Sequence, residues 1–121
     1  HLSRRMMLVT GLVMLVLAEL VLAFAVVSWQ VFAGAMLWGL HMGFTQGLFS
    51  KLVADTAPAE LRGSAFGIFN LTSGVSMLVA SVIAGLLWQS VGPQATFLAG
   101  AIFAALAAIG VVAYKDNPAA A

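Results

Sequence analysis

The chain has 121 residues, of which 63% are hydrophobic and only 7% are charged, and its formal net charge is +1. A soluble globular domain carries about 25% charged residues, so the composition excludes that class. The small net charge gives no basic face of the kind that nucleic-acid binding needs. The absence of cysteine excludes disulfides, thiolate metal sites and a cysteine nucleophile. The sequence therefore predicts a protein embedded in a lipid bilayer, with no nucleic-acid partner.

Four long apolar runs follow one another along the chain, separated by three polar breaks. A helix that crosses a bilayer needs about 20 predominantly apolar residues, and each run reaches that length. Strands of a membrane barrel alternate in polarity over about ten residues, and these runs do not. The sequence thus predicts an all-α membrane protein, a single unit of four transmembrane helices at Met6–Val27, Val31–Ala54, Ser64–Gln89 and Ala95–Tyr114.

The three breaks differ in charge. Ser28–Gln30 and Ser90–Gln94 are short and uncharged, whereas Asp55–Gly63 holds the one cluster of charges in the interior of the sequence. Every basic residue lies before the first run, beside this charged break or after the last run: Arg4, Arg5, Lys51, Arg62 and Lys115. Basic residues accumulate on the cytoplasmic side of membrane proteins. We therefore expect both termini and the charged break to be cytoplasmic.

The charged break has its own local pattern. Pro58 disfavours a helix at the residue before it, so the second helix is expected to end there. The residues after Pro58 can form a short helical turn with an acid early and Arg62 late, which suits the helix dipole. Arg62 can pair with Asp55, reach a neighbouring helix end or bind a lipid phosphate. Gly63 and Gly67 allow close packing where the third helix begins.

Small residues form stripes on the second and third helices. The second helix carries three glycines at four-residue spacing: Gly39, Gly43 and Gly47. The third helix carries a similar stripe that includes Gly67 and Asn70. Such stripes let another helix approach closely, so both helices are predicted to lie inside a larger helical assembly or beside a cavity. The first and fourth helices consist mostly of Leu, Val, Ala, Ile and Phe and are predicted to be peripheral.

Glu19 and His41 are ionisable residues inside the apolar runs. A charge at mid-bilayer costs several kcal/mol, so each should be neutral, paired or beside a wet cavity. Measured from Trp29, taken as the turn, they lie about 15 and 18 Å along neighbouring antiparallel helices. We predict a hydrogen bond or ion pair between them, linked to protons or substrate, since histidine titrates near neutrality. The alternative is that His41 is a neutral packing residue and Glu19 is protonated or paired elsewhere.

Three further polar residues, Thr45, Gln46 and Asn70, are candidates for lining a cavity and hydrogen-bonding a substrate. Polar side chains in membranes more often bond neighbouring helices, so helix contact is the competing interpretation. The sequence has no Gly-rich phosphate loop and no catalytic or metal-binding cluster of suitable spacing. We expect no enzymatic activity, no cofactor and no metal site.

Several stretches resemble one family. Val53–Asn70 resembles the loop and helix start between the tenth and eleventh helices of Major Facilitator Superfamily transporters. Ala84–Trp88 with Gly92 and Pro93 is similar to the end of the eleventh helix and the turn into the twelfth, and Arg4 with Arg5 resembles the basic loop before the ninth. The resemblance implies the C-terminal third of a twelve-helix secondary transporter that works by alternating access, driven by an ion gradient, in a bacterial inner membrane.

The resemblance also implies partners: the remaining helices of a larger transporter, a small-molecule substrate that the sequence does not specify, and protons as a candidate coupling ion. A first residue other than Met favours a fragment too. The alternative is a self-contained four-helix proton-coupled exporter of the small multidrug resistance type, acting as a dimer. Chain length and the acid in the first helix fit that alternative, but it gives Asp55–Gly63 no role. A third class, a membrane adaptor that does not transport, has no positive feature.

Overall fold

The structure, a computed structural model, describes residues 3–114. It consists of four α-helices, with a short 3-10 helix between the second and third: α1 (Arg4–Ala23), α2 (Ser28–Thr56), η1 (Ala59–Leu61), α3 (Arg62–Ser90) and α4 (Pro93–Ala113). No β-strand occurs in the described part of the chain. The predicted all-α fold class with four helices is therefore confirmed. The predicted polar tail that begins at Lys115 lies outside the described residues.

Three of the helical segments are long and apolar enough to cross a membrane: α1, η1 together with α3, and α4. Helix α2 is not among them, although its 29 residues exceed the 20 of α1. Its middle carries His41, Thr45 and Gln46, which lower its hydropathy. At about 1.5 Å per residue α2 is about 44 Å long, so its length suffices for a span and its polarity sets it apart.

The turn between α1 and α2 differs from the predicted one. Helix α1 ends at Ala23 and α2 begins at Ser28, so the predicted break Ser28–Gln30 is wrong and forms the first turn of α2. Gln30 explains the difference, because its Oε1 accepts hydrogen bonds from the backbone N–H groups of Val26 (2.7 Å) and Val27 (3.2 Å). These amides have no partner within the helix. The polar residues therefore start a helix instead of interrupting one.

The charged break is narrower than Asp55–Gly63. Helix α2 continues through Asp55, and α3 begins at Arg62. The backbone of Ala57 is extended (φ −85°, ψ 134°), which confirms that Pro58 stops the helix at the preceding residue. Helix η1 confirms the predicted short helical turn. The break is short because no residue before Pro58 disrupts the helix.

The second short connection contains Gly92 and Pro93. Gly92 has φ +122°, a backbone conformation that residues with a side chain rarely adopt. Pro93 occupies the first position of α4, where its fixed φ and missing N–H suit a helix start. The edge-to-face contact of Trp88 with Phe97, at 6.0 Å between ring centroids, holds the ends of α3 and α4 together.

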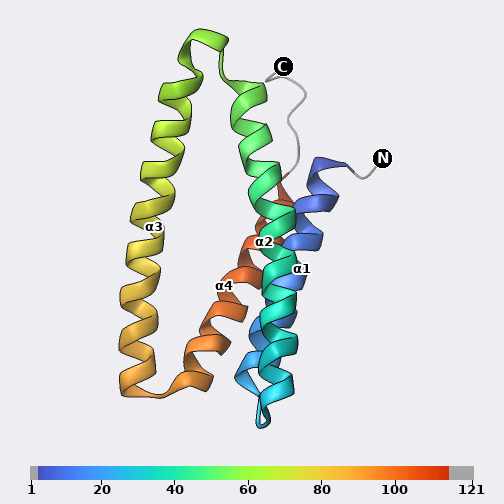
Figure 1. Cartoon of the computed structure of the whole chain (residues 1–121), viewed down its shortest axis with the longest axis vertical. Helices are drawn as coiled ribbons and strands as arrows, with labels where there is room; N and C mark the ends of the chain where they lie inside the picture. The colour runs from blue at the N-terminus through green and yellow to red at the C-terminus, as the bar shows by residue number, and fades with distance from the viewer. Residues whose placement is uncertain (1–2, 115–121) are drawn as a thin grey trace.

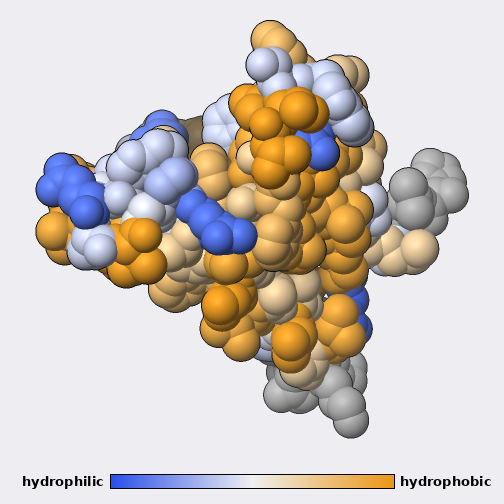
Figure 2. All heavy atoms as spheres, turned by 90° about the horizontal axis from the view of Figure 1, so that it is seen from below, coloured by the Kyte–Doolittle hydropathy of each residue, from blue (hydrophilic) through white to orange (hydrophobic). Residues whose placement is uncertain are grey.

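Helix α1 is the central element of the chain (Figure 1). It packs along both α2 and α4, whereas α3 stands apart and has no buried residue. Figure 2 shows the end of the molecule that carries the two short turns, where apolar side chains cover most of the surface. Large side chains such as Val26, Trp29 and Phe32 are mostly exposed. Such a surface requires a bilayer or further helices around it.

The core of the chain consists mostly of small residues, with Leu48 as the one large side chain among its buried hydrophobic residues within 3–114. Ala18 is fully buried, and the buried side chains of α4 are Ala101 and Ala104. Small side chains at helix contacts let the backbones approach closely. Close approach is thus found where α1 meets α2 and where α1 meets α4. The peripheral place of α1 and α4 in a larger assembly stays a prediction.

Replacing the fully buried Ala18 by leucine is expected to destabilise the helical unit by about 1–3 kcal/mol, because three extra carbons must enter a filled contact. Ala35→Leu is the matched control, since Ala35 is exposed on α2. The measurement is reversible unfolding in mixed micelles, followed by circular dichroism. Equal stability of the two variants would contradict the packing described for α1.

Candidate functional site

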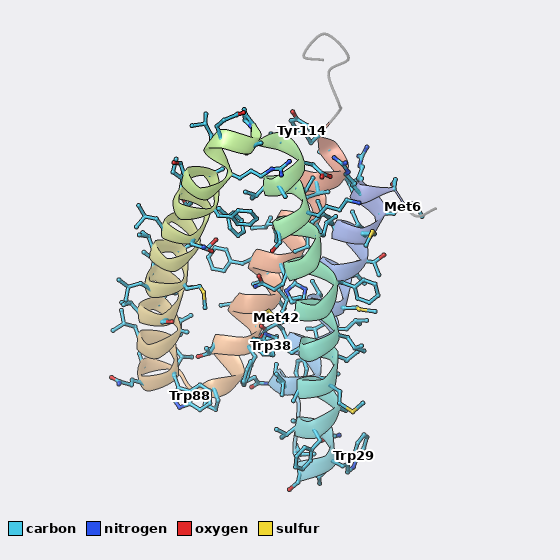
Figure 3. The ribbon with its side chains drawn as sticks, turned by 45° about the horizontal axis from the view of Figure 1, so that its top comes forward. Met6, Trp29, Trp38, Met42, Trp88 and Tyr114 are labelled. Atoms are coloured by element: carbon cyan, nitrogen blue, oxygen red, sulfur yellow. The ribbon has the colours of Figure 1, made fainter. Side chains whose placement is uncertain are left out.

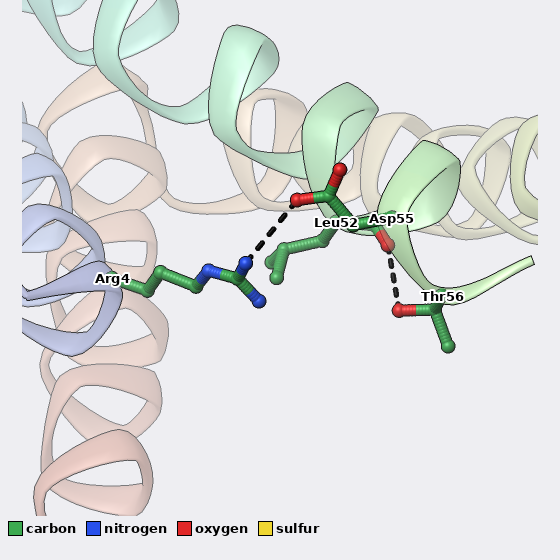
Figure 4. Close-up of polar contacts among 4 residues, drawn as sticks. All are labelled: Arg4, Leu52, Asp55 and Thr56. Carbon is green, nitrogen blue, oxygen red and sulfur yellow. Dashed lines mark hydrogen bonds and ion pairs between the residues drawn. The ribbon is translucent and has the colours of Figure 1, made fainter.

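Among residues 3–114, the charged residues other than Glu19 lie at one end of the helices, where the two arginines of α1 each contact another helix. Arg4 Nη2 lies 3.2 Å from Asp55 Oδ2 at the end of α2 (Figure 4). Arg5 donates a hydrogen bond to the backbone oxygen of Val112, in the last turn of α4. A cation at a helix C-terminus is favourable for the helix dipole. The N-terminus of α1 thus ties the C-terminal ends of α2 and α4 together.

Asp55 was one of several predicted partners of Arg62, but in this structure the ion pair of Asp55 is with Arg4. Pro58 and Gly63 flank η1, and a Cβ atom at Gly63 or Gly67 would meet nothing within 4 Å. The predicted close packing at these glycines is therefore not made within residues 3–114. The sequence reading missed Arg4 as a partner because 51 residues separate it from Asp55.

The Arg4–Asp55 pair is expected to contribute little stability, since the two side chains are 62% and 42% exposed. Exposed ion pairs contribute about 0–1 kcal/mol, and salt screens them. A double-mutant cycle with Arg4→Gln and Asp55→Asn, read by unfolding at low and high salt, measures this coupling. A coupling that exceeded this range and persisted in high salt would show that the pair is shielded from water.

Glu19 lies on the side of α1 that faces α4. A Cβ atom built at Gly100 would lie 2.9 Å from Glu19 Cδ and 3.0 and 3.1 Å from its two carboxyl oxygens. The carboxyl group therefore fills the space that the missing side chain of Gly100 leaves. None of the side-chain hydrogen bonds within residues 3–114 involves Glu19.

A groove of about 660 Å³ opens beside this contact, between α3 and α4. Its walls are mostly apolar, and Glu19 is the one ionisable residue among those that line it. Two hydroxyl groups, of Ser76 and Thr96, add polarity. Both hydroxyls donate to backbone oxygens, Ser76 to Thr72 at 2.9 Å and Thr96 to Gly92 at 3.2 Å. The arrangement places one carboxyl group at an otherwise apolar groove within the helical region.

His41 lies elsewhere. Its Nδ1 is 2.7 Å from the backbone oxygen of Gly11 on α1, and because a carbonyl only accepts, Nδ1 is the donor. A Cβ atom at Gly11 would meet Thr45 Cγ2 at 2.7 Å, so α1 and α2 approach closely here. This contact gives one nitrogen of the imidazole a partner within the helix pair.

The structure does not bring Glu19 and His41 together, and the predicted pair between them is corrected. Glu19 lies four residues before the end of α1 at Ala23, and His41 lies thirteen residues after the start of α2 at Ser28. At helical rise they are about 6 and 20 Å from the turn. The prediction took Trp29 as the turn, and this shift of the turn accounts for the error in depth.

The other predicted polar residues are dispersed. Thr45 is buried, and its Oγ1 donates to the backbone oxygen of His41 at 2.9 Å. Gln46 on α2 and Asn70 on α3 are both exposed. A Cβ atom at any of the three stripe glycines would meet nothing within 4 Å: Gly39, Gly43 and Gly47. These stripes are therefore uncovered in this chain.

Two features of the site escaped the sequence reading. Gly100 and Gly11 make the close contacts with Glu19 and Thr45, yet neither lies in the glycine stripes predicted on the second and third helices. For Gly100 a signal was available, because Gly100, Ala104 and Ala108 are small residues at four-residue spacing. Within residues 3–114 no three His, Cys, Asp or Glu residues lie close enough together to hold a metal ion.

Three of the four labelled Trp and Tyr side chains lie near the ends of the helices, and Trp38 lies within α2 (Figure 3). Trp29 and Trp88 lie toward the end with the two short turns, and Tyr114 lies toward the charged end (Figure 3). Tryptophan and tyrosine are enriched at both membrane–water interfaces. Their placement fits helices that cross a bilayer from one interface to the other.

Comparison with known proteins gives one consistent result. The model of the Major Facilitator Superfamily matches residues 1–121. The chain is 33% identical over 73 residues to an uncharacterized MFS-type transporter, MJ1317, of Methanocaldococcus jannaschii, covering 60% of this chain and 18% of the relative. It is 26% identical over 106 residues to the inner membrane transport protein YajR of Escherichia coli K12, covering 87% of this chain and 23% of the relative. No solved structure matches the chain significantly.

Proposed function

Because the chain belongs to the Major Facilitator Superfamily, we propose that it is part of a secondary transporter that moves small molecules by alternating access, driven by an ion gradient. The match of the family model over all 121 residues carries this proposal. The chain spans about a fifth of the length of the two curated relatives, at 18% and 23%. Family membership makes a transporter the expected activity and not an enzyme.

We propose that the four helices form one unit of a larger helical assembly, corresponding to the C-terminal helices of a twelve-helix transporter. The exposed glycine stripe of α2 and the absence of buried residues on α3 support this proposal, since both surfaces can accept further helices. Substrate sites of such transporters lie at the interface between repeats near the middle of the bilayer. Gln46 and Asn70, both exposed, are our candidates for substrate or helix contacts.

We propose the inner membrane as the location, with the charged end in the cytoplasm, on the basis of Arg4, Arg5, Lys51 and Arg62. The described residues at the opposite turns carry no charge. Single cysteines in a cysteine-free full-length protein test this orientation. Ser90→Cys is expected to react with a membrane-impermeant maleimide in intact cells, and Glu60→Cys only after permeabilisation. The reverse pattern would place the charged end outside.

Transport itself is tested with the full-length protein that carries this chain, reconstituted in liposomes. A proton gradient is imposed, and uptake is measured for a panel of radiolabelled sugars, amino acids and organic ions. We expect one compound to accumulate beyond equilibrium while the gradient lasts, and not after an uncoupler collapses it. Gradient-independent equilibration of all compounds would contradict secondary active transport. The 121-residue chain alone is expected to give no flux, because its uncovered surfaces require further helices.

The alternative, a self-contained four-helix exporter of the small multidrug resistance type, is not favoured. The family model that matches the chain is that of the Major Facilitator Superfamily, and the two relatives are about four to six times longer than the matched segment. Flux from reconstituted 121-residue dimers would restore that alternative.

A further inference from the structure

Gly100 occupies a position on α4 where no other residue fits without displacing Glu19. A Cβ atom there would come within 2.9 to 3.1 Å of three atoms of the Glu19 carboxyl group. The neighbouring residue Ala101 is buried, so α4 is held close to α1 at this level. By contrast, a Cβ atom at Gly110 on the same helix would meet nothing within 4 Å. Of these two glycines of α4, only Gly100 therefore lies where an added side chain would displace the Glu19 carboxyl group.

Glu19 is half-buried, with packed residues near it on α1. Ala18 beside it is fully buried, and Leu22 one turn later packs against Gly34 of α2. The groove between α3 and α4 reaches Glu19. This groove of about 660 Å³ leaves open space beside the carboxyl group. Glu19, Ser76 and Thr96 are the polar residues among those that line it.

We propose that Gly100 is a positioning residue for Glu19. Gly100 leaves the space in which the carboxyl group of Glu19 lies, so that this group faces the groove between α3 and α4. A proton reaches the carboxyl group through this groove. The inference rests on the proposed function only for the claim that protonation of Glu19 is used in transport. The location of the carboxyl group and its route of access stand on geometry alone.

The route is tested by the rate at which dicyclohexylcarbodiimide, an apolar reagent for protonated carboxyl groups, modifies Glu19 in membranes that contain the full-length protein. Mass spectrometry of the peptide measures the modification. Because a misplacement of about 1 Å can change a rate by about 100-fold, we expect Gly100→Ala to slow the reaction by about tenfold or more. Gly110→Ala, the matched control, should react like the unaltered protein. Equal rates for the two variants would overturn the positioning role.

A second pair of variants tests the groove without changing Gly100. Ala80→Phe adds a ring to the groove wall, whereas Leu78→Phe adds the same ring at an exposed position outside the lining. Ala80→Phe is expected to slow modification of Glu19 by a similar factor of about ten, on the same geometric ground, and Leu78→Phe to leave it unchanged. Equal rates would show that the groove is not the route.

Rescue separates positioning from simple packing. The aspartate carboxyl group is one methylene shorter, so Glu19→Asp should withdraw the acid from the new methyl group of Gly100→Ala. Gly100→Ala alone is expected to lose proton-coupled transport, and the double variant is expected to regain it. If the single variant does not fold, the double variant should also restore accumulation of folded protein. Absence of recovery would overturn the proposal. A different outcome would refute only the role of Glu19 in transport. In that outcome, the Gly100 and Ala80 variants are modified at the expected rates, but Glu19→Gln transports normally.

Discussion

Glu19→Gln is expected to reduce proton-coupled accumulation of substrate by the full-length protein by about 100-fold, the scale typical for loss of a positioned proton donor or acceptor. Glutamine keeps the shape of the side chain and its contact with Gly100 but cannot exchange a proton. A charged carboxylate in the membrane is costly, so a residue of this kind is expected to have a function. Proton uptake into liposomes, recorded with an internal pH-sensitive dye together with labelled substrate, measures the effect.

The matched control is Glu60→Gln, which removes the same acid from the exposed 3-10 helix at the charged end. Glu60→Gln should leave the number of protons taken up per substrate molecule unchanged. His41→Gln is expected to act independently of Glu19→Gln, because Nδ1 of His41 bonds to Gly11 and not to Glu19. Two residues without a shared partner give nearly additive effects. Normal coupling in Glu19→Gln would exclude Glu19 as the proton-linked residue, and strong non-additivity would revive the predicted pair.

Gly43→Leu is expected to weaken association of α2 with the rest of the full-length protein by about 1–3 kcal/mol, because the new side chain overfills a helix contact. In the 121-residue chain the same substitution should change stability little, since a Cβ atom at Gly43 has no neighbour within 4 Å. The two results together would identify the stripe as a contact with helices outside this chain. Thermal unfolding of both proteins in detergent provides the measurement.

Gly110→Leu is the control for this prediction, because Gly110 is also open but lies outside both stripes. It should leave the full-length protein as stable as before. A stripe that faced lipid in the full-length protein would give the same result for Gly43→Leu and Gly110→Leu. That outcome would contradict the proposal that further helices cover α2.

The charged break shows how far local chemistry predicts structure. Pro58 ends α2 at Ala57 and is followed by a helical turn, as the sequence predicted, since both effects depend on neighbouring residues. Arg4 was not predicted as the partner of Asp55, because an ion pair between residues 51 positions apart depends on how α1 and α2 align. That alignment follows in turn from the Ala23–Ser28 connection, whose cap by Gln30 the sequence reading did not identify.

Sequence alone determined the class of this protein, its four helices, the charge cluster between the second and third helices and the family resemblance, because all four depend on composition and on order along the chain. Tertiary structure decided which helix faces meet. It assigned the close contacts to Ala18, Gly11 and Gly100, and left the regular glycine stripe of α2 uncovered. It also directed Glu19 toward α4 and His41 toward α1. The physical reason is that helical periodicity specifies the faces of a helix, whereas the turn between two helices sets their depth and register.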